Sequence, residues 1–181
     1  PLSIESLNDF LYFFDNITFR EHPDWGVCYC YSFHFVGTAA EWNNREKNRA
    51  SVIDLISTGK MHGYLAYTGG TPIGWCNAND KNAFSRLKLN KELWDVQPAP
   101  TASVVCFLIA PEYRGLGVAR KLLTRVCSDF SKLSYEIVEA YPDKDPISNE
   151  DNCAGPLALY KGLGFEKIKS TDESYIMQKR I

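Results

Sequence analysis

The sequence lacks the features that mark membrane proteins and nucleic-acid-binding proteins. None of its apolar runs is long enough to span a bilayer, and no signal-peptide pattern opens the chain. Its 20 basic and 22 acidic residues give a formal net charge of −2, whereas a protein that mainly binds nucleic acid needs a basic face for the phosphates. The composition therefore predicts a globular protein with neither a membrane nor a nucleic acid as its partner.

The six cysteines form neither a disulfide-dense pattern nor a zinc-binding set. Cys28 and Cys30 are separated by one residue in an alternating stretch, and no second Cys/His pair completes a zinc site. Cys76, Cys106 and Cys127 lie in apolar contexts, where a thiol behaves as a small hydrophobic group. We therefore expect no bound metal, and we expect a reducing, cytoplasmic location.

The chain length and the absence of an evident linker predict one domain over residues 1–181. Residues 1–62 are expected to form N-terminal helices and a first strand, and residues 63–181 a core. The helical patterns run from Ser3 to about Asp15 and between Ala39 and Thr58, and the alternation in Val27–Phe35 predicts a strand. Gly69-Gly70 predicts a tight turn between strands at Gly63–Thr68 and Pro72–Asn79.

The most informative stretch joins a buried strand to a helix. Ala102–Ile109 is an almost unbroken apolar run, as expected of a strand covered on both faces. Pro111 has no N–H for a ladder, so pairing should stop near Ala110. Apolar residues at helical spacing then predict a helix from Val118 to about Leu133.

The turn between this strand and this helix is suited to binding a pyrophosphate. Gly115 and Gly117 leave room for backbone N–H groups to approach a ligand, and the first turn of a helix attracts negative charge. Arg114 adds a charged donor, and Ala119 keeps the turn narrow. The spacing Arg-x-x-Gly-x-Ala resembles the (Gln/Arg)-x-x-Gly-x-(Gly/Ala) pattern of the GNAT N-acetyltransferase superfamily.

A second motif follows in the order that this family requires. Tyr135–Tyr141 predicts another strand, and Gly155–Phe165 is similar to the family's tyrosine helix and the Gly-Phe turn after it. The resemblance covers roughly Gly63 to the C-terminus. It implies an α/β fold with a mixed, mostly antiparallel central sheet of about six to seven strands flanked by helices.

The resemblance also implies a reaction, in which acetyl-CoA donates its acetyl group to a primary amine of a small molecule or peptide in a ternary complex. The pantetheine arm would lie along Phe107, Leu108 and Ile109 as an added strand. Tyr160 would be the general acid that protonates the departing thiolate. The remaining coenzyme-binding residues that the family pattern implies are Arg114, Gly115, Leu116, Gly117, Val118, Ala119 and Arg120.

The general base and the acceptor are less clear from the sequence. Ala102–Ile109 contains no acid, which leaves Glu139, His34 and Asp80 as candidates, acting directly or through water. An acidic stretch would attract a cationic acceptor, although a solvated loop is the simpler interpretation. Its carboxylates are those of Asp143, Asp145, Glu150 and Asp151.

Three alternatives stay open at this point. A non-catalytic domain that binds or senses acyl-CoA would keep the phosphate turn without turnover, and a homodimer is compatible with exposed strand edges. The third is a Rossmann-type dinucleotide-binding site. Gly115-x-Gly117-x-x-Arg120 partly matches its G-x-G-x-x-G motif, and Glu139 stands where that motif has an acidic residue about twenty positions later. That pattern fails at its third glycine, where Arg120 stands instead.

Overall fold

One six-stranded sheet organises the chain. The computed structural model describes residues 1–94, 99–146, 148 and 152–181, and the strands lie in the order β1-β2-β3-β4-β6-β5. Within these described ranges β3 and β4 pair in parallel and every other neighbouring pair is antiparallel, which confirms the predicted mixed sheet. The strands are β1 (Gly63–Thr68), β2 (Thr71–Asp80), β3 (Thr101–Ile109), β4 (Ile137–Ala140), β5 (Glu166–Ser170) and β6 (Tyr175–Arg180).

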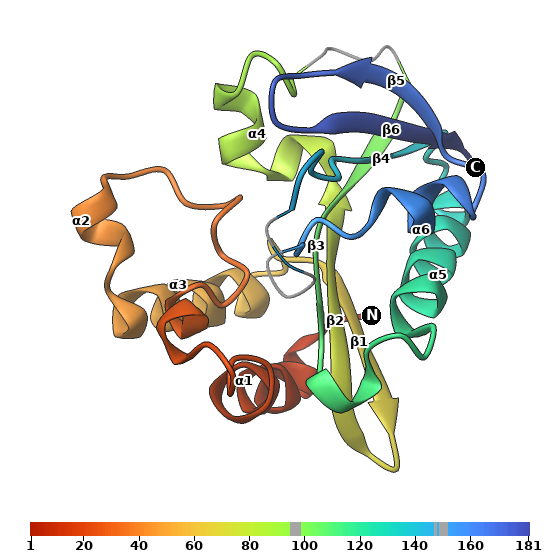
Figure 1. Ribbon diagram of the computed structural model, residues 1–181. Coiled ribbons are helices and arrows are strands. Elements are labelled where there is room, and N and C mark those ends of the chain that lie inside the picture. Colours follow the sequence, from red (N-terminus) through yellow and green to blue (C-terminus); the bar gives the residue numbers. More distant parts are fainter. Residues whose placement is uncertain (95–98, 147, 149–151) are drawn as a thin grey trace.

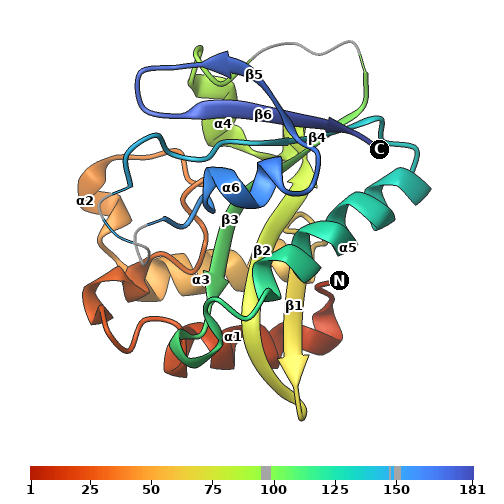
Figure 2. The same cartoon turned by 45° about the vertical axis from the view of Figure 1, so that its right-hand side comes forward.

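Helices cover both faces of the sheet (Figures 1 and 2). Helices α1 (Leu7–Asn16) and α3 (Arg45–Ser57) pack on one face, and α5 (Val118–Lys132) and α6 (Leu157–Lys161) on the other. Two short helices complete the set. Helix α2 (Ala39–Trp42) lies to the left of α3, and α4 (Ser85–Leu89) lies near β5 and β6 at the top of Figure 1. Short 3-10 turns complete the description: η1 (Ile4–Ser6), η2 (Pro23–Val27), η3 (Lys81–Ala83) and η4 (Pro111–Tyr113).

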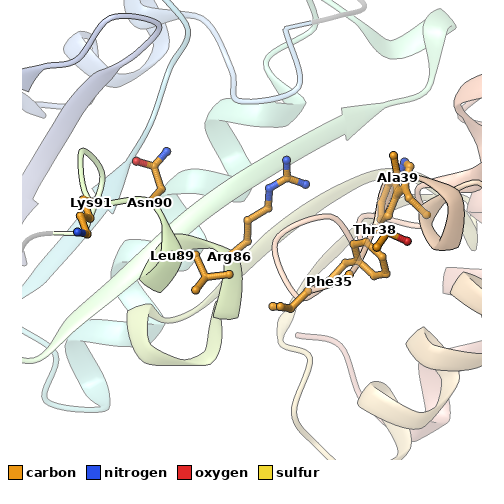
Figure 3. Close-up of a pocket in the computed structure, with 10 residues that line it drawn as sticks. Phe35, Thr38, Ala39, Arg86, Leu89, Asn90 and Lys91 are labelled. Atoms are coloured by element: carbon orange, nitrogen blue, oxygen red, sulfur yellow. The ribbon is translucent and has the colours of Figure 1, made fainter.

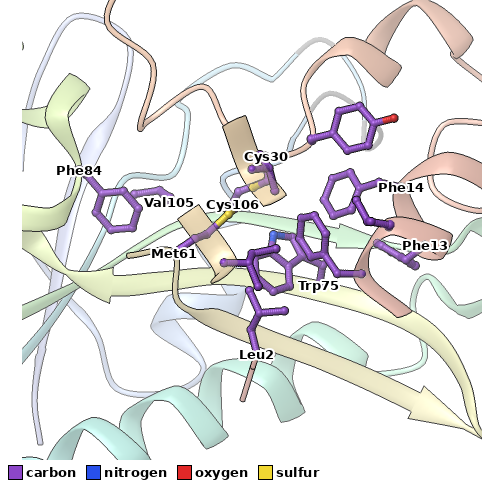
Figure 4. Close-up of a cluster of buried hydrophobic side chains, with 14 of the residues drawn as sticks. Leu2, Phe13, Phe14, Cys30, Met61, Trp75, Phe84, Val105 and Cys106 are labelled. Atoms are coloured by element: carbon purple, nitrogen blue, oxygen red, sulfur yellow. The ribbon is translucent and has the colours of Figure 1, made fainter. Parts of the chain in front are cut away.

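Two hydrophobic cores hold these layers together. On the face of α1 and α3, Trp75 of β2 is completely buried, and the ring of Phe10 meets it edge-on with centroids 4.9 Å apart (Figure 4). On the other face, α5 contributes a stripe of buried residues at helical spacing, as the sequence predicts. The stripe consists of Leu122, Leu123, Val126, Cys127 and Phe130.

A bulge in β3 separates the end of this strand from β4. Asn77 of β2 pairs with Cys106, and the next residue, Ala78, pairs with Val104, so Val105 is an extra residue in β3. Beyond the bulge β3 pairs only with β2, because its pairing with β4 covers only Thr101–Val104. The C-terminal half of the central strand is thereby left with one edge that no strand of the described chain pairs.

The predicted strand at Val27–Phe35 is wrong. Tyr29 and Cys30 have φ values of 43° and 54°, which an extended strand does not allow, and the segment folds into successive turns. The N–H of Tyr31 donates to the Cys28 carbonyl at 2.7 Å, and that of His34 donates to the Tyr31 carbonyl at 2.8 Å. Tyr29, one of the apolar residues of the alternating pattern, is buried within these turns. Its hydroxyl accepts a hydrogen bond from Arg45 Nε at 3.1 Å.

The other predicted elements are confirmed with small shifts at their ends. The β1–β2 hairpin turns at Gly69-Gly70, and β5 and β6 form the closing hairpin. Of the acidic stretch, Asp143 and Asp145 are described, whereas Glu150 and Asp151 lie outside the described residues. No described helix is long and apolar enough to cross a membrane.

Candidate functional site

A cavity of about 720 Å³ lies at the C-terminal end of β3, within the usual range for small-molecule sites. Three distant parts of the chain form its walls, namely residues 18–25, residues 107–120 and residues 152–159. Every residue predicted to hold the coenzyme lines this cavity except Leu116. Leu116 is 67% exposed and lies outside the lining of this cavity.

The glycine turn has the backbone geometry expected of an anion-binding loop. Gly115 and Gly117 have φ values of 73° and 78°, a region that residues with a Cβ rarely adopt. A Cβ at either position would meet no atom within 4 Å, so it is the backbone conformation and ligand access that need glycine here. Helix α5 begins at Val118, and the unpaired N–H groups of its first turn follow directly.

A third glycine fixes the position of this turn against the sheet. A Cβ on Gly74 of β2 would lie 2.9 Å from Ile109 Cδ1 and 3.0 Å from Val118 Cγ1. The missing side chain therefore lets the end of β3 and the start of α5 pack on β2. This contact sets the N-terminus of α5 beside the central strand.

The two arginines of the turn are held by protein groups at the cavity wall. Arg114 Nη1 forms an ion pair of 2.9 Å with Glu21 Oε2, and its Nε donates to the Ile109 carbonyl at 3.3 Å. Arg120 Nη1 donates to the Gly162 carbonyl at 3.1 Å. Both guanidinium groups thus lie at the cavity wall, and Glu21, which also lines the cavity, offsets the charge of Arg114.

The free edge of β3 is partly covered by the chain itself. The N–H of Phe107 donates to the Cys153 carbonyl at 2.6 Å. Because backbone groups alternate in direction along a strand, Ile109 presents its N–H to the same edge. The part of the edge open to an added strand therefore begins beyond Phe107, which shortens the contact predicted from the sequence.

Tyr160 lies behind this covering segment. Its side chain is completely buried, its ring packs beside that of Phe107 with centroids 6.5 Å apart, and its hydroxyl donates to the Ala154 carbonyl at 2.5 Å. Burial, followed by the nearby Cys76, raises the pKa of the phenol well above its usual value. The hydroxyl is therefore protonated at neutral pH and lies next to the free edge of β3.

A cluster of thiols adjoins the same point. The Cys106 thiol forms hydrogen bonds with the thiols of Cys153 and Cys30, which together with burial raise its pKa well above the usual value. Figure 4 shows the Cys30 and Cys106 side chains facing each other. All six cysteines are free thiols. Among the described residues, no group of three or more histidine, cysteine or acidic side chains is placed to hold a metal ion.

Glu139 lies away from the cavity, in a buried polar network. It pairs with Ser103 across the parallel strands, and Phe107 of the cavity lies four positions further along β3, at about 3.3 Å per position. The Glu139 carboxylate forms an ion pair of 2.7 Å with Lys81 Nζ and accepts from the Tyr141 hydroxyl at 2.6 Å. The hydroxyl of Tyr141 in turn lies 2.9 Å from Ser103 Oγ.

The structure does not bring the other two candidate bases to the cavity lining. Asp80 caps η3 by accepting from the Asn82 N–H at 2.7 Å, and it accepts from the Tyr135 hydroxyl at 2.9 Å. His34 is bonded to the Ala83 backbone, and its Nε2 is buried without a hydrogen-bond partner in the described part of the chain. Burial lowers the pKa of His34 to about 4, so this imidazole is neutral at physiological pH.

His34 should make stability depend on pH in the acid range. The unfolded chain binds a proton at His34 below pH about 6.5, whereas the folded chain binds one only near pH 4. The contribution of neutral His34 is therefore complete above pH 6.5 and is lost as the pH falls toward 4, up to about 3 kcal/mol. Urea unfolding between pH 7 and 4 should show a shallower decline for His34→Gln than for the wild type. Equal declines would contradict this account.

The N-terminal wall of the cavity was missed by the sequence analysis. Thr18, Phe19 and Glu21 line it, and the rings of His22 and Trp25 stack there with centroids 4.2 Å apart. No local pattern links these residues to a turn ninety positions away in the chain. The pair His22 and Trp25, in a short polar stretch, was the one local sign of a binding surface. It has no fixed spacing to the glycine turn, so the sequence does not link the two.

Comparisons with known proteins agree with this geometry. The sequence profile described as the acetyltransferase (GNAT) family matches residues 19–165. The matched region includes the N-terminal wall from Phe19 onward, the glycine turn and Tyr160. No curated protein sequence matched the chain.

Two solved structures share the fold over nearly their whole length. The PaiA N-acetyltransferase of Thermoplasma acidophilum, in complex with coenzyme A, has a TM-score of 0.60 at 19% identity, covering 99% of this chain and 96% of that one. An N-acetyltransferase of Staphylococcus aureus Mu50 has a TM-score of 0.56 at 14% identity, covering 98% and 94%. The profile match spans most of the sequence, and the chain belongs to the GNAT acetyltransferase family.

Proposed function

We propose that this protein is an N-acetyltransferase that moves the acetyl group of acetyl-CoA to a primary amine. The cavity formed by the glycine turn, the end of β3 and the start of α5 carries the proposal. It combines backbone donors at a helix N-terminus with two arginines at the wall, Arg114 and Arg120. Family membership supports acyl-CoA-dependent acetyl transfer in general.

Acetyl-CoA is the substrate that we assign to this cavity. Its pyrophosphate would bind to the backbone N–H groups of Gly115–Ala119, with Arg114 and Arg120 as charged neighbours. Its pantetheine amides would bind along β3 at Ile109, and at Phe107 if Cys153 gives up its hydrogen bond. Leu108, whose backbone groups face β2, would line the cavity beside them. The PaiA N-acetyltransferase, of similar fold, was solved with coenzyme A.

Two residues are assigned to the proton transfers. Tyr160 would give its phenolic proton to the departing thiolate, because it is protonated at neutral pH and lies beside the free edge of β3. Glu139 would accept the amine proton at a distance, through Tyr141 or water, since Tyr141 connects its carboxylate to Ser103. The nucleophile is the neutral amine, which attacks the thioester carbonyl directly in a ternary complex.

Titration calorimetry with acetyl-CoA and a coupled assay of CoA release with a panel of amines would test the proposal. We expect micromolar or tighter coenzyme binding and release of free CoA that depends on the amine. Tight binding without turnover on any amine would favour the alternative, a non-catalytic acyl-CoA sensor. Absence of coenzyme binding would remove both functions.

The Tyr160→Phe variant isolates the proposed acid. It should reduce kcat by at least about a hundredfold, the lower end of the usual contribution of general acid–base catalysis. The Kd for acetyl-CoA should change less than threefold, since the ring still packs against Phe107 and Phe165. Stopped-flow and steady-state rates at matched coenzyme saturation would measure this, and an unchanged kcat would remove the acid role.

The remaining parts of the proposal concern location and partners. We infer that the enzyme works in the cytoplasm, with acetyl-CoA and an amine as its partners and without nucleic acid, membrane or metal. A homodimer is compatible with the exposed edge strands β1 and β5. Light scattering on the purified chain would determine the oligomeric state.

A further inference from the structure

A second cavity, of about 760 Å³, lies between α4 and the segment that leads into α2. Phe35, Thr38 and Trp42 line one side, and Arg86, Asn90 and Lys91 line the other. Figure 3 shows the Arg86 side chain extending from α4 into the space that separates the two sides. No residue of this cavity lines the coenzyme cavity among the described residues.

One wall of this cavity is aromatic. The rings of Phe35 and Trp42 lie 5.2 Å apart between centroids, and Trp42 stacks on Tyr31 at 6.4 Å. At the rim, Val36 is 61% exposed and Leu89 is 67% exposed. Large apolar side chains that stay in water beside an aromatic wall favour a ligand with an apolar body.

The opposite wall is positively charged. In the described part of the chain, the Arg86 guanidinium has no hydrogen-bond or ion-pair partner, and neither has the Lys91 ammonium. On the aromatic side, the Glu41 carboxylate is already engaged by the N–H and hydroxyl of Thr38 and by Lys47. An unpaired guanidinium facing an aromatic wall fits a carboxylate, which it can bind through two hydrogen bonds.

The chain segment of residues 23–42 contributes lining residues to both cavities. Its start, η2, carries Trp25 of the coenzyme cavity, and its later part carries Phe35 and Trp42 of the second cavity. Between them, Cys30 contacts Cys106, in the half of β3 that pairs with β2 but not with β4. Helices α2 and α4, which carry lining residues of the second cavity, lie on the same side of β3 as α3, whereas α5 and α6 lie on the other side (Figure 1). Donor and acceptor would thus approach the central strand from different directions.

We propose that the second cavity is the acceptor site, and that the acceptor is an amine which also carries a carboxylate and an apolar or aromatic body, as a hydrophobic amino acid does. Arg86 binds the carboxylate, and the wall of Phe35 and Trp42 holds the apolar body. The inference rests on the proposed acetyl transfer and names the substrate class of that reaction. It differs from the expectation that an acidic loop attracts a cationic acceptor.

Matched amines test the substrate class. L-Phenylalanine carries the carboxylate, 2-phenylethylamine lacks it, and spermidine carries only positive charge. We expect kcat/KM for L-phenylalanine to exceed that for 2-phenylethylamine by at least tenfold, and spermidine to be the poorest acceptor. A preference for spermidine, or equal use of the first two amines, would overturn the proposal.

The variant Arg86→Glu tests the residue. It should raise KM for L-phenylalanine at least tenfold and leave both kcat and KM for acetyl-CoA nearly unchanged. Arg180→Glu, with the same charge reversal at the C-terminal end of β6 far from the cavity, is the matched control and should behave as the wild type (Figure 1). Equal effects of the two substitutions would contradict a specific contact.

A binding measurement separates this inference from the proposed function. 3-Phenylpropanoate has the carboxylate and the ring without the amine, so it cannot be acetylated. Its binding to the wild-type protein and to Arg86→Glu can be followed by tryptophan fluorescence, because Trp42 lines the cavity. Binding that Arg86→Glu weakens at least tenfold supports the site even if no acetyl transfer occurs. Absence of binding in a protein that binds acetyl-CoA refutes the site and leaves the proposed function standing.

Discussion

Replacing Gly117 with valine is expected to weaken acetyl-CoA binding at least a hundredfold. Gly117 has φ = 78°, and a β-branched residue resists this conformation, so the turn must shift at the start of α5. Losing two charge-assisted hydrogen bonds from N–H groups to the pyrophosphate would cost about 1.5–3 kcal/mol each. Titration calorimetry with acetyl-CoA on the folded variant measures the effect.

The control for this prediction is another glycine with a positive φ, at a position away from the coenzyme cavity. Gly59, after α3, has φ = 66°, and a Cβ there would also meet nothing within 4 Å. Gly59→Val should therefore lose stability by backbone strain and keep its affinity for acetyl-CoA. If Gly117→Val is folded and binds as tightly as Gly59→Val, the pyrophosphate does not lie on this turn.

The second large effect concerns stability, at the buried ion pair between Glu139 and Lys81. The two side chains are 0% and 5% exposed, and Oε1 and Nζ lie 2.7 Å apart. Glu139→Gln would leave a buried ammonium without its carboxylate, which should lower the free energy of unfolding by about 3–5 kcal/mol. Chemical denaturation followed by circular dichroism would measure the loss.

A double variant shows whether the loss comes from the unpaired charge. Glu139→Leu with Lys81→Met replaces both partners by apolar groups of similar size, and it should be more stable than Glu139→Gln alone. The activity of folded Glu139→Gln, assayed well below its melting temperature, then tests the proton-acceptor role separately. A double variant less stable than Glu139→Gln would mean that the hydrogen bonds from Tyr141 and Gln178 dominate.

The coenzyme turn could be predicted because its physics is local. A buried strand, a proline stop, two glycines and an amphipathic helix follow one another without a gap, and each sets the conformation of its own backbone. The mixed, mostly antiparallel sheet followed from the resemblance to a known family. The predicted and observed ends of β3 and α5 agree within about two residues, as expected when strong breakers flank an element.

What could not be predicted depends on contacts between distant residues. Alternation in Val27–Phe35 is typical of a strand, but Tyr29 is buried because Arg45 and α1 pack around it, and that packing requires turns. The buried ion pair of Glu139 could not be predicted either, since nothing near Glu139 in sequence indicates that Lys81 is its partner. In both places tertiary contacts decide the outcome, and a local pattern does not contain them.

The coenzyme cavity has walls from residues 18–25, 107–120 and 152–159, and this arrangement links occupancy to the folding of the whole chain. No single segment can form the cavity alone, so a molecule that fits it binds the native state and not the denatured ensemble. At a concentration of one hundred times its Kd, such a molecule adds about 2.7 kcal/mol to the free energy of unfolding. A high cellular concentration of the molecule that binds this cavity would therefore keep more of the protein in its native form and protect it from proteases.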